Sequence, residues 1–130
     1  MITVCIIAAA LSSQVSRVYS MDRWSALSML ESGNDDQAVG THGEVSRFQI
    51  RPVLWPGGDP KDAGSALMAA QKIMSERVAK FKQSHGRSPT DFEFYVLWNA
   101  PVQLQHPSKA VSERAMRFSN LVHRDDVARR

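Results

Sequence analysis

The feature that most constrains the fold is one long amphipathic segment near the middle of the chain. Between Pro60 and Ser84, apolar residues recur at spacings of three and four, as on one face of an α-helix. They are Ala63, Ala66, Leu67, Ala70, Ile73, Met74, Val78 and Phe81. Asp59 is a suitable N-cap with Pro60 at the first helical position, and Gly86 is suited to end the helix. Because such a stripe needs other elements packed on it, the sequence predicts a largely helical domain.

Three shorter helices are predicted around the long one. Trp24–Glu31 has apolar residues at every third position, and the segment SGNDD that follows stops it, because glycine and asparagine readily adopt the left-handed conformation. Thr90 and Glu93 form a capping box that opens a second short helix, which Pro101 ends. Pro107–Ser108 introduces the last helix. Its apolar face carries Val111, Ala115, Phe118 and Val122.

The remaining segments predict a small non-helical part. Asn34–Gly43 reads as a loop, Glu44–Ile50 fits either a short strand or one turn of helix, and Pro56–Pro60 breaks the chain. We therefore expect an α+β fold that is mostly α-helical, with a small β or loop excursion after the first helix. With 130 residues, one domain is expected over 21–123, followed by a charged tail over 124–130.

Composition excludes several classes of protein. No apolar run reaches the roughly 20 residues needed to span a bilayer, so stable membrane insertion is not expected. Cys5 is the only cysteine and the four histidines are scattered, so we expect no disulfide framework, no metal site and no cofactor. A net charge of +3 and a pI near 9.4 favour an anionic partner, such as a cell-wall polymer, nucleic acid or an acidic membrane face.

Three blocks of sequence carry a resemblance to a known family. ESGNDDQAVG (Glu31–Gly40) is similar to the family's Glu-Ser, a loop, and Ala-Val-Ser or Ala-Val-Gly. GEVSRFQIRP (Gly43–Pro52) is similar to Gly-Ala-x-Gly-Leu-Met-Gln-Ile-x-Pro, and YVLWNAP (Tyr95–Pro101) falls where the family has Ala-x-x-Tyr-Asn-Ala-Gly. In this order and with these gaps, the blocks resemble the lysozyme-like, soluble lytic transglycosylase superfamily, which includes goose-type lysozymes. The resemblance covers about Trp24 to Val122.

The resemblance implies a fold and an activity. It implies a lysozyme-like fold and a monomeric glycosidase that degrades the cell wall. Its substrate would be the β-1,4 bond between N-acetylmuramic acid and N-acetylglucosamine in peptidoglycan. The products would be hydrolysed, as by a muramidase (a hydrolase), or closed to a 1,6-anhydro ring, as by a lytic transglycosylase. The sequence leaves these two outcomes open.

Glu31 is the expected catalytic residue. Cleaving a glycosidic bond requires a proton on the leaving oxygen, so the acid has to hold its proton near neutral pH. A carboxyl at a helix end, shielded by apolar neighbours, has its charged form disfavoured by desolvation. The alternative is an ordinary, solvated glutamate in the last turn of a helix. The three blocks favour the catalytic interpretation.

Five further residues complete the predicted site. The amides of Gln49 and Asn99 can donate to and accept from sugar groups, although Gln49 could instead bond the loop backbone and Asn99 could cap a helix. Trp98 offers an apolar ring face to a pyranose, and Ser32 is grouped with the site as a support that hydrogen-bonds the loop backbone. Glu44 is a possible second carboxylate, with a solvated loop charge as its alternative.

The start of the chain bears on localisation. Ile2–Leu11 has the length of a signal-peptide core, and Ala10 and Ser12 suit cleavage after Ser12. No Lys or Arg precedes this run, so a buried N-terminal helix within residues 1–20 is the alternative. With a signal peptide the protein is secreted, to the periplasm or the medium. Without one it is cytoplasmic, as a phage lysin would be.

Two other functions compete with catalysis. In the second block Ser46 replaces a usual glycine, and in the third Trp98 and Pro101 replace Tyr and Gly. These departures are consistent with a non-catalytic peptidoglycan-binding module of the same fold. A helical nucleic-acid-binding protein is the third hypothesis, based on the net charge and on Arg114, Arg117 and Arg124. No recognition motif accompanies those arginines, so nucleic acid is not the expected partner.

Overall fold

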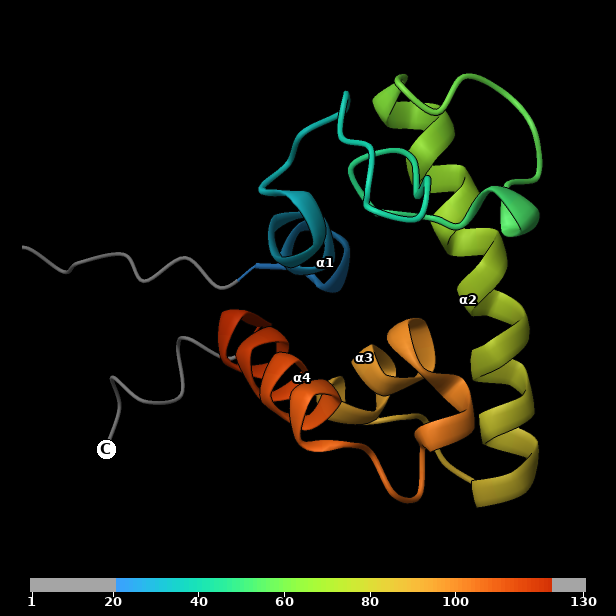
Figure 1. The fold of residues 1–130 in the computed structure, drawn as a ribbon. Helices are drawn as coiled ribbons and strands as arrows, with labels where there is room; N and C mark the ends of the chain where they lie inside the picture. The colour runs from blue at the N-terminus through green and yellow to red at the C-terminus, as the bar shows by residue number, and fades with distance from the viewer. Residues whose placement is uncertain (1–20, 123–130) are drawn as a thin grey trace, which may run out of the picture.

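The computed structural model describes residues 21–122, and this part of the chain is mostly helical. Its elements are α1 (Arg23–Ser32), η1 (Pro52–Leu54), α2 (Ala63–His85), α3 (Asp91–Asn99), η2 (Pro101–Gln103) and α4 (Lys109–Val122), where η marks a 3₁₀ turn. The long α2 stands along one side of the molecule, with α1, α3 and α4 beside it (Figure 1). The prediction of a mostly helical fold is confirmed. The proposed signal segment 1–20 and the charged tail 124–130 lie outside the described residues.

Short polar side chains and glycines set the helix ends. The Asp22 carboxylate accepts hydrogen bonds from the first backbone N–H groups of α1, and Gly33 ends this helix with φ of 68°. Thr90 and Glu93 form the capping box that was predicted for α3. Gly86 ends α2 in the left-handed conformation, also as predicted.

The predicted start of α2 was three residues too early. The N-cap is Asp62, whose carboxylate accepts from the N–H of Ser65 at 2.8 Å, and not Asp59. Asp59 instead accepts from the N–H of Lys61 and closes a turn before the helix. Ala63 is consequently exposed, whereas the rest of the predicted apolar stripe is buried or packs against the core.

The core lies where α3 meets α4, with α1 packed against α4 and α2 against α3. Tyr95 and Phe118 are fully buried there, and their rings lie 5.5 Å apart. A path of contacting aromatic rings leads outward from Phe118 and ends at the last turn of α3. It runs through Phe94, Trp24, Phe48 and Trp98, with successive centroids 5.7–6.5 Å apart. The path ties the loop between α1 and α2 to the helices.

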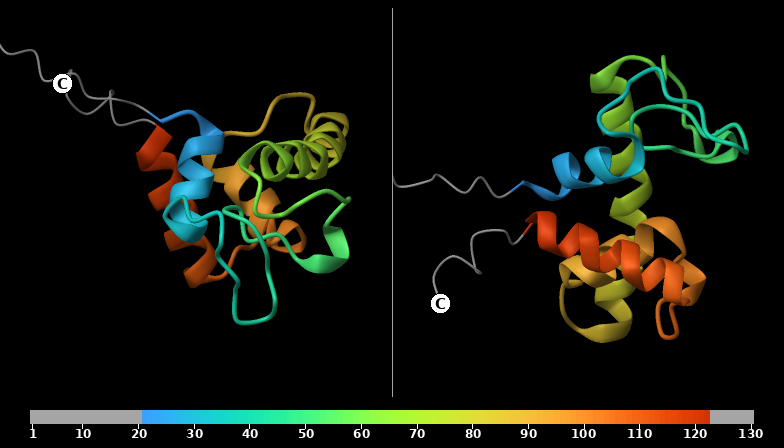
Figure 2. Two further views of the ribbon diagram at one scale, coloured as in Figure 1. Left: turned by 90° about the horizontal axis from the view of Figure 1, so that it is seen from above. Right: turned by 60° about the vertical axis from the view of Figure 1, so that its left-hand side comes forward.

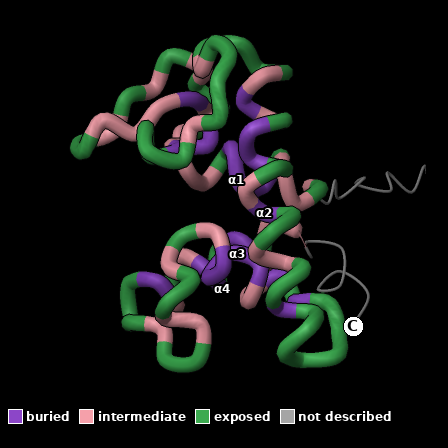
Figure 3. Tube along the Cα trace, turned by 90° about the vertical axis from the view of Figure 1, so that its right-hand side faces the viewer, coloured by how far each residue is buried: buried purple, intermediate pink, exposed green. Residues whose placement is uncertain are grey.

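This loop is neither the strand nor the helical turn that the sequence allowed for Glu44–Ile50. Two isolated antiparallel bridges, Val39 with Val45 and Val45 with Ile50, are the pairings it makes within the described residues. Between Val45 and Ile50 the chain makes a tight turn, in which Ser46 and Gln49 have positive φ angles of 71° and 52°. Figure 2 shows the loop lying over α1 and the N-terminal half of α2. It is mostly exposed, while the helices carry most of the buried residues (Figure 3).

Candidate functional site

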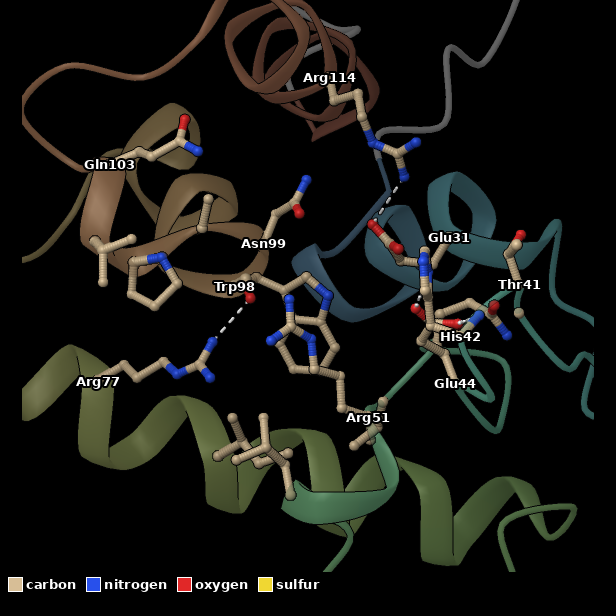
Figure 4. A pocket seen from close by; sticks show the side chains of 18 residues that line it. Glu31, Thr41, His42, Glu44, Arg51, Arg77, Trp98, Asn99, Gln103 and Arg114 are labelled. Atoms are coloured by element: carbon tan, nitrogen blue, oxygen red, sulfur yellow. Dashed lines mark hydrogen bonds and ion pairs between the residues drawn. The ribbon is translucent and has the colours of Figure 1, made fainter.

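A cleft of about 610 Å³ lies between this loop and the C-terminal end of α3. Its walls come from the last turn of α1, the loop, one face of α2, the end of α3 with η2, and Arg114 of α4. Its volume is in the usual range of small-molecule sites. Figure 4 shows the polar side chains that converge on it. Glu31, Gln49, Trp98 and Asn99, which the sequence analysis grouped as one site, all line this cleft.

The Glu31 carboxyl is held at the cleft by two donors on one oxygen. Its Oε1 accepts from the Tyr95 hydroxyl at 2.7 Å and from Nη2 of Arg114 at 3.2 Å. Its Oε2 accepts no hydrogen bond from residues 21–122. The side chain is only 12% exposed. Oε2 is therefore the oxygen left for a ligand.

Tyr95 connects the members of this group, and the sequence analysis missed it. Besides donating to Glu31, its hydroxyl accepts from Nε of Arg114 at 2.7 Å and from Nδ2 of Asn99 at 3.2 Å. Burial raises the pKa of Tyr95, and the nearby negative charge of Glu31 raises it further. Tyr95 therefore stays protonated and remains a donor to Glu31. The signal in the sequence was its place four residues before Asn99, on the same face of α3.

Glu44 lies in the same cleft and is held ionised. Its Oε2 accepts from the backbone N–H of His42 at 2.9 Å, and its Oε1 lies 3.5 Å from Nδ1 of the same residue. Hydrogen bonds from its own backbone N–H and from that of His42 lower the pKa of Glu44. Glu44 is therefore ionised at neutral pH, and its carboxylate is bonded to the backbone of its own loop. It is a second, ionised carboxylate in the cleft.

Gly40 makes room for two of these side chains. A Cβ atom built on it would lie 2.2 Å from Oε2 of Glu44 and 2.6 Å from Oε1 of Gln49. Both side chains thus rest against bare backbone, which places them beside each other in the cleft. Gly40, the last residue of the first sequence block, therefore has a steric role here.

The predicted amides have different environments. Gln49 donates through Nε2 to the carbonyl of Ser46 at 3.1 Å, so the predicted bond to the loop backbone exists, while the residue also lines the cleft. Asn99 is the last residue of α3, the C-cap being Ala100, and its side chain is exposed to the cleft.

Ser32 does not line the cleft. Its hydroxyl donates to the carbonyl of Arg47 at 2.7 Å and accepts from the N–H of Asp35 at 3.0 Å. It clips the loop to the end of α1, which is the supporting role expected of it.

Three arginines at the cleft were not predicted for it. Arg114 had been considered only for nucleic acid, but it binds Glu31 and Tyr95. Arg77 of α2 donates through Nη1 to the carbonyls of Leu97 and Trp98, both at 2.8 Å, and so holds the end of α3. Arg51 also lines the cleft. These pairings join residues 19 to 83 positions apart, for which the sequence offered no pattern.

No group of three or more His, Cys, Asp or Glu side chains in residues 21–122 is arranged to hold a metal ion. Nor does this part of the chain contain a helix with the length and apolar character to cross a membrane. Comparisons of the chain with protein-family models, with curated proteins and with solved structures gave no match in any of the three. The cleft itself is therefore the basis for assigning a function.

Proposed function

We propose that this protein is a lysozyme-like enzyme that cleaves the β-1,4 glycosidic bond of peptidoglycan, with Glu31 as its general acid. The observation that carries the proposal is the environment of the Glu31 carboxyl group. It is nearly buried, one of its oxygens is held by Tyr95 and Arg114, and the other is left toward a cleft large enough for sugars. The resemblance of the three sequence blocks to soluble lytic transglycosylases supports the same assignment.

The proposed reaction uses Oε2 of Glu31 as the proton source. The proton passes from Oε2 to the glycosidic oxygen as the bond from that oxygen to the sugar breaks, and the leaving sugar departs with a free hydroxyl. Tyr95 and Arg114 stabilise the carboxylate that remains, because both donate to its Oε1. The oxygen that then attacks the sugar belongs either to its own 6-hydroxyl, giving the 1,6-anhydro product, or to water, and the proton it loses returns to Oε2 of Glu31.

The other residues of the cleft are assigned to binding and positioning. Asn99 and Gln49 present amide groups to the hydroxyl and N-acetyl substituents of the glycan, and Trp98 offers an indole ring. Glu44, held ionised, accepts hydrogen bonds from the glycan or orients a water molecule for hydrolysis.

A non-catalytic peptidoglycan-binding module is the second candidate, and one observation favours it. Nη2 of Arg114 lies 3.2 Å from Oε1 of Glu31, and a guanidinium at this distance is a typical partner of a carboxylate. A charged carboxylate accepts hydrogen bonds from sugar hydroxyls but has no proton to give. The two candidates therefore differ in whether Glu31 holds a proton when glycan fills the cleft.

The test is digestion of purified peptidoglycan by the wild type and by Glu31→Gln, with mass spectrometry of the products. The glutamine is nearly isosteric and still forms hydrogen bonds but cannot deliver a proton, so we expect the rate to fall by about 10² to 10⁴ while glycan binding persists. Products ending in 1,6-anhydro sugars indicate a transglycosylase, and reducing ends indicate hydrolysis.

Two further variants complete this experiment. Glu44→Gln should cost much less than Glu31→Gln if a single acid suffices, and nearly as much if the enzyme is a two-carboxylate hydrolase. Glu113→Gln on the exposed side of α4 is the matched control and should behave as the wild type. Equal activity of wild type and Glu31→Gln, or a wild type that binds peptidoglycan without cutting it, leaves the binding module.

A further inference from the structure

Two arginines on one wall of the cleft have hydrogen-bond donors that the described chain does not use. Arg77 donates through Nη1 to the carbonyls of Leu97 and Trp98. Its other guanidinium nitrogens make no hydrogen bond within residues 21–122. The Arg51 side chain, which follows the loop turn, makes neither a hydrogen bond nor an ion pair in the same range. An arginine has five N–H donors, so most of those on this wall are available to a ligand.

The two guanidinium groups are close enough to repel each other. Burial lowers the pKa of Arg77, and the neighbouring charge of Arg51 lowers it further, against a smaller opposing effect from Glu76. In Figure 4 both side chains lie on the wall near Trp98, apart from Glu31 and Glu44. Two like charges facing a partly enclosed cleft are unfavourable by themselves. An anion between them would replace this repulsion with two attractions.

This wall therefore favours a negatively charged group of the ligand, a preference that the carboxylates of Glu31 and Glu44 in the same cleft do not provide. Guanidinium groups present paired N–H donors whose spacing matches the two oxygens of a carboxylate. Arg77 is also fixed in place by its bonds to the end of α3, so little of its freedom is lost on binding.

We propose that Arg51 and Arg77 form a subsite for a carboxylate group carried by the glycan. This inference rests on the proposed function, which it sharpens. The cleft selects a polymer that bears carboxylates over a neutral β-1,4-linked N-acetylglucosamine chain. In peptidoglycan the carboxylate can be that of the lactyl ether on the sugar or one on the peptide attached to it.

The test measures binding and not cleavage, so that it stands apart from the role of Glu31. In a Glu31→Gln background, calorimetry compares Arg51→Gln with Arg51 for three probes: chitotetraose, peptidoglycan strands stripped of peptide, and strands that keep their peptides. We expect Arg51→Gln to weaken binding of a carboxylate-bearing probe about tenfold, the size of one charge-assisted hydrogen bond, and to leave chitotetraose unchanged. The loss should shrink at high salt.

The choice of probe identifies the carboxylate. A selective loss on peptide-free strands assigns the subsite to the lactyl group, and a loss confined to peptide-bearing strands assigns it to the peptide. Arg51→Lys should recover part of the affinity because it keeps the charge. Arg117→Gln, the same charge change on an exposed residue of α4 outside the cleft, should have no effect on any probe.

Two results would overturn the subsite. One is an equal effect of Arg51→Gln on charged and neutral glycans, and the other is no effect on either. The proposed function fails separately, if the wild type does not cut peptidoglycan. A selective effect of Arg51→Gln in a protein that does not cut would place the same subsite in a binding module.

Discussion

Around α3 and α4, side chains are held by apolar burial, whereas between Gly33 and Asp62 the chain is held mainly by polar contacts. Phe118 and Tyr95 have no exposed surface in the helical part. In the loop, Arg47 donates twice to the Asp36 carboxylate, at 2.7 and 2.9 Å, and accepts through its carbonyl from the Ser32 hydroxyl. The cleft lies where these two parts meet, so one of its carboxylates, Glu31, comes from a helix and the other, Glu44, from the loop.

The helical part and the loop have different roles, the first in the stability of the fold and the second in the shape of the cleft. The loop reaches the core through the buried side chains of Phe48 and Ile50 and through Trp55, which is partly buried against it. A change in the helical core should therefore affect the whole fold. A change at the loop should affect the cleft and leave the helices in place.

Phe118→Ala should have the largest effect on stability. The ring is fully buried and packs on Phe94 and Tyr95, so its removal leaves a cavity in the core and should lower the free energy of unfolding by about 3 to 5 kcal/mol. Urea denaturation followed by circular dichroism measures this. Met116→Ala on the exposed side of the same helix is the control, expected within about 0.5 kcal/mol of wild type. Equal losses in the two variants would contradict the assigned core.

Gly40→Ala should damage the cleft with little effect on the fold. The new methyl group displaces the flexible ends of Glu44 and Gln49, not backbone, so the melting temperature should stay near that of wild type. Cleavage of peptidoglycan should fall by about 10²-fold, because the displaced groups no longer fit the substrate. A large drop in melting temperature would show that the loop and the core are not separable.

Acid should weaken the start of α3 through Glu93. Its bonds to Arg87 and Thr90 lower the pKa of Glu93 from 4.5 to about 2. Because the pKa is depressed on folding, this carboxylate stabilises the fold fully above about pH 4.5 and loses that effect as the pH falls toward 2. Glu93→Gln should therefore be a few degrees less stable than wild type at pH 7 and match it more closely at pH 2.5. A difference that does not change with pH would contradict this.

Ser28→Ala should have the smallest effect, and in the opposite direction. The Ser28 hydroxyl is buried in α1 and has no hydrogen-bond partner within the described chain. Replacing it with a methyl removes an unsatisfied polar group, so the variant should be as stable as wild type or up to about 1 kcal/mol more stable. Ser32→Ala, one turn later, is the contrast: it loses the bonds to Arg47 and Asp35 and should be less stable. Chemical denaturation of both variants decides the sign.

Local signals predicted the helices and failed where the choice was not local. Thr90 with Glu93 and the glycines after α1 and α2 marked helix ends correctly, because capping depends on neighbours within a few positions. Asp59 was predicted as the N-cap of α2 because Pro60 follows it, but the chain makes a turn there and the helix is capped by Asp62.

The residues of the candidate site were predicted only in part, because several of its contacts join residues that are far apart in the sequence. Glu31, Gln49 and Asn99 were found by their sequence blocks, and the structure places them in one cleft. Tyr95 was missed because nothing in the sequence around it shows that its hydroxyl donates to Glu31, 64 positions away. Arg114 was missed because the apolar periodicity of α4 shows which face of the helix is buried. It does not show which residues of other elements lie beside the edge of that face.

The Tyr95 hydroxyl has a consequence for how substitutions combine. This one oxygen donates to Glu31 and accepts from Asn99 and Arg114, so three elements of the fold share a single atom. Substitutions at these three positions should not act independently, since each alters the same hydroxyl and contacting residues couple by about 0.5 to 3 kcal/mol. In evolutionary terms the group is epistatic: a change at Asn99 that is harmless beside Arg114 can be harmful without it. If Glu31 were replaced, the constraint on Asn99 and Arg114 would relax at both positions together, because both contact the hydroxyl that donates to Glu31.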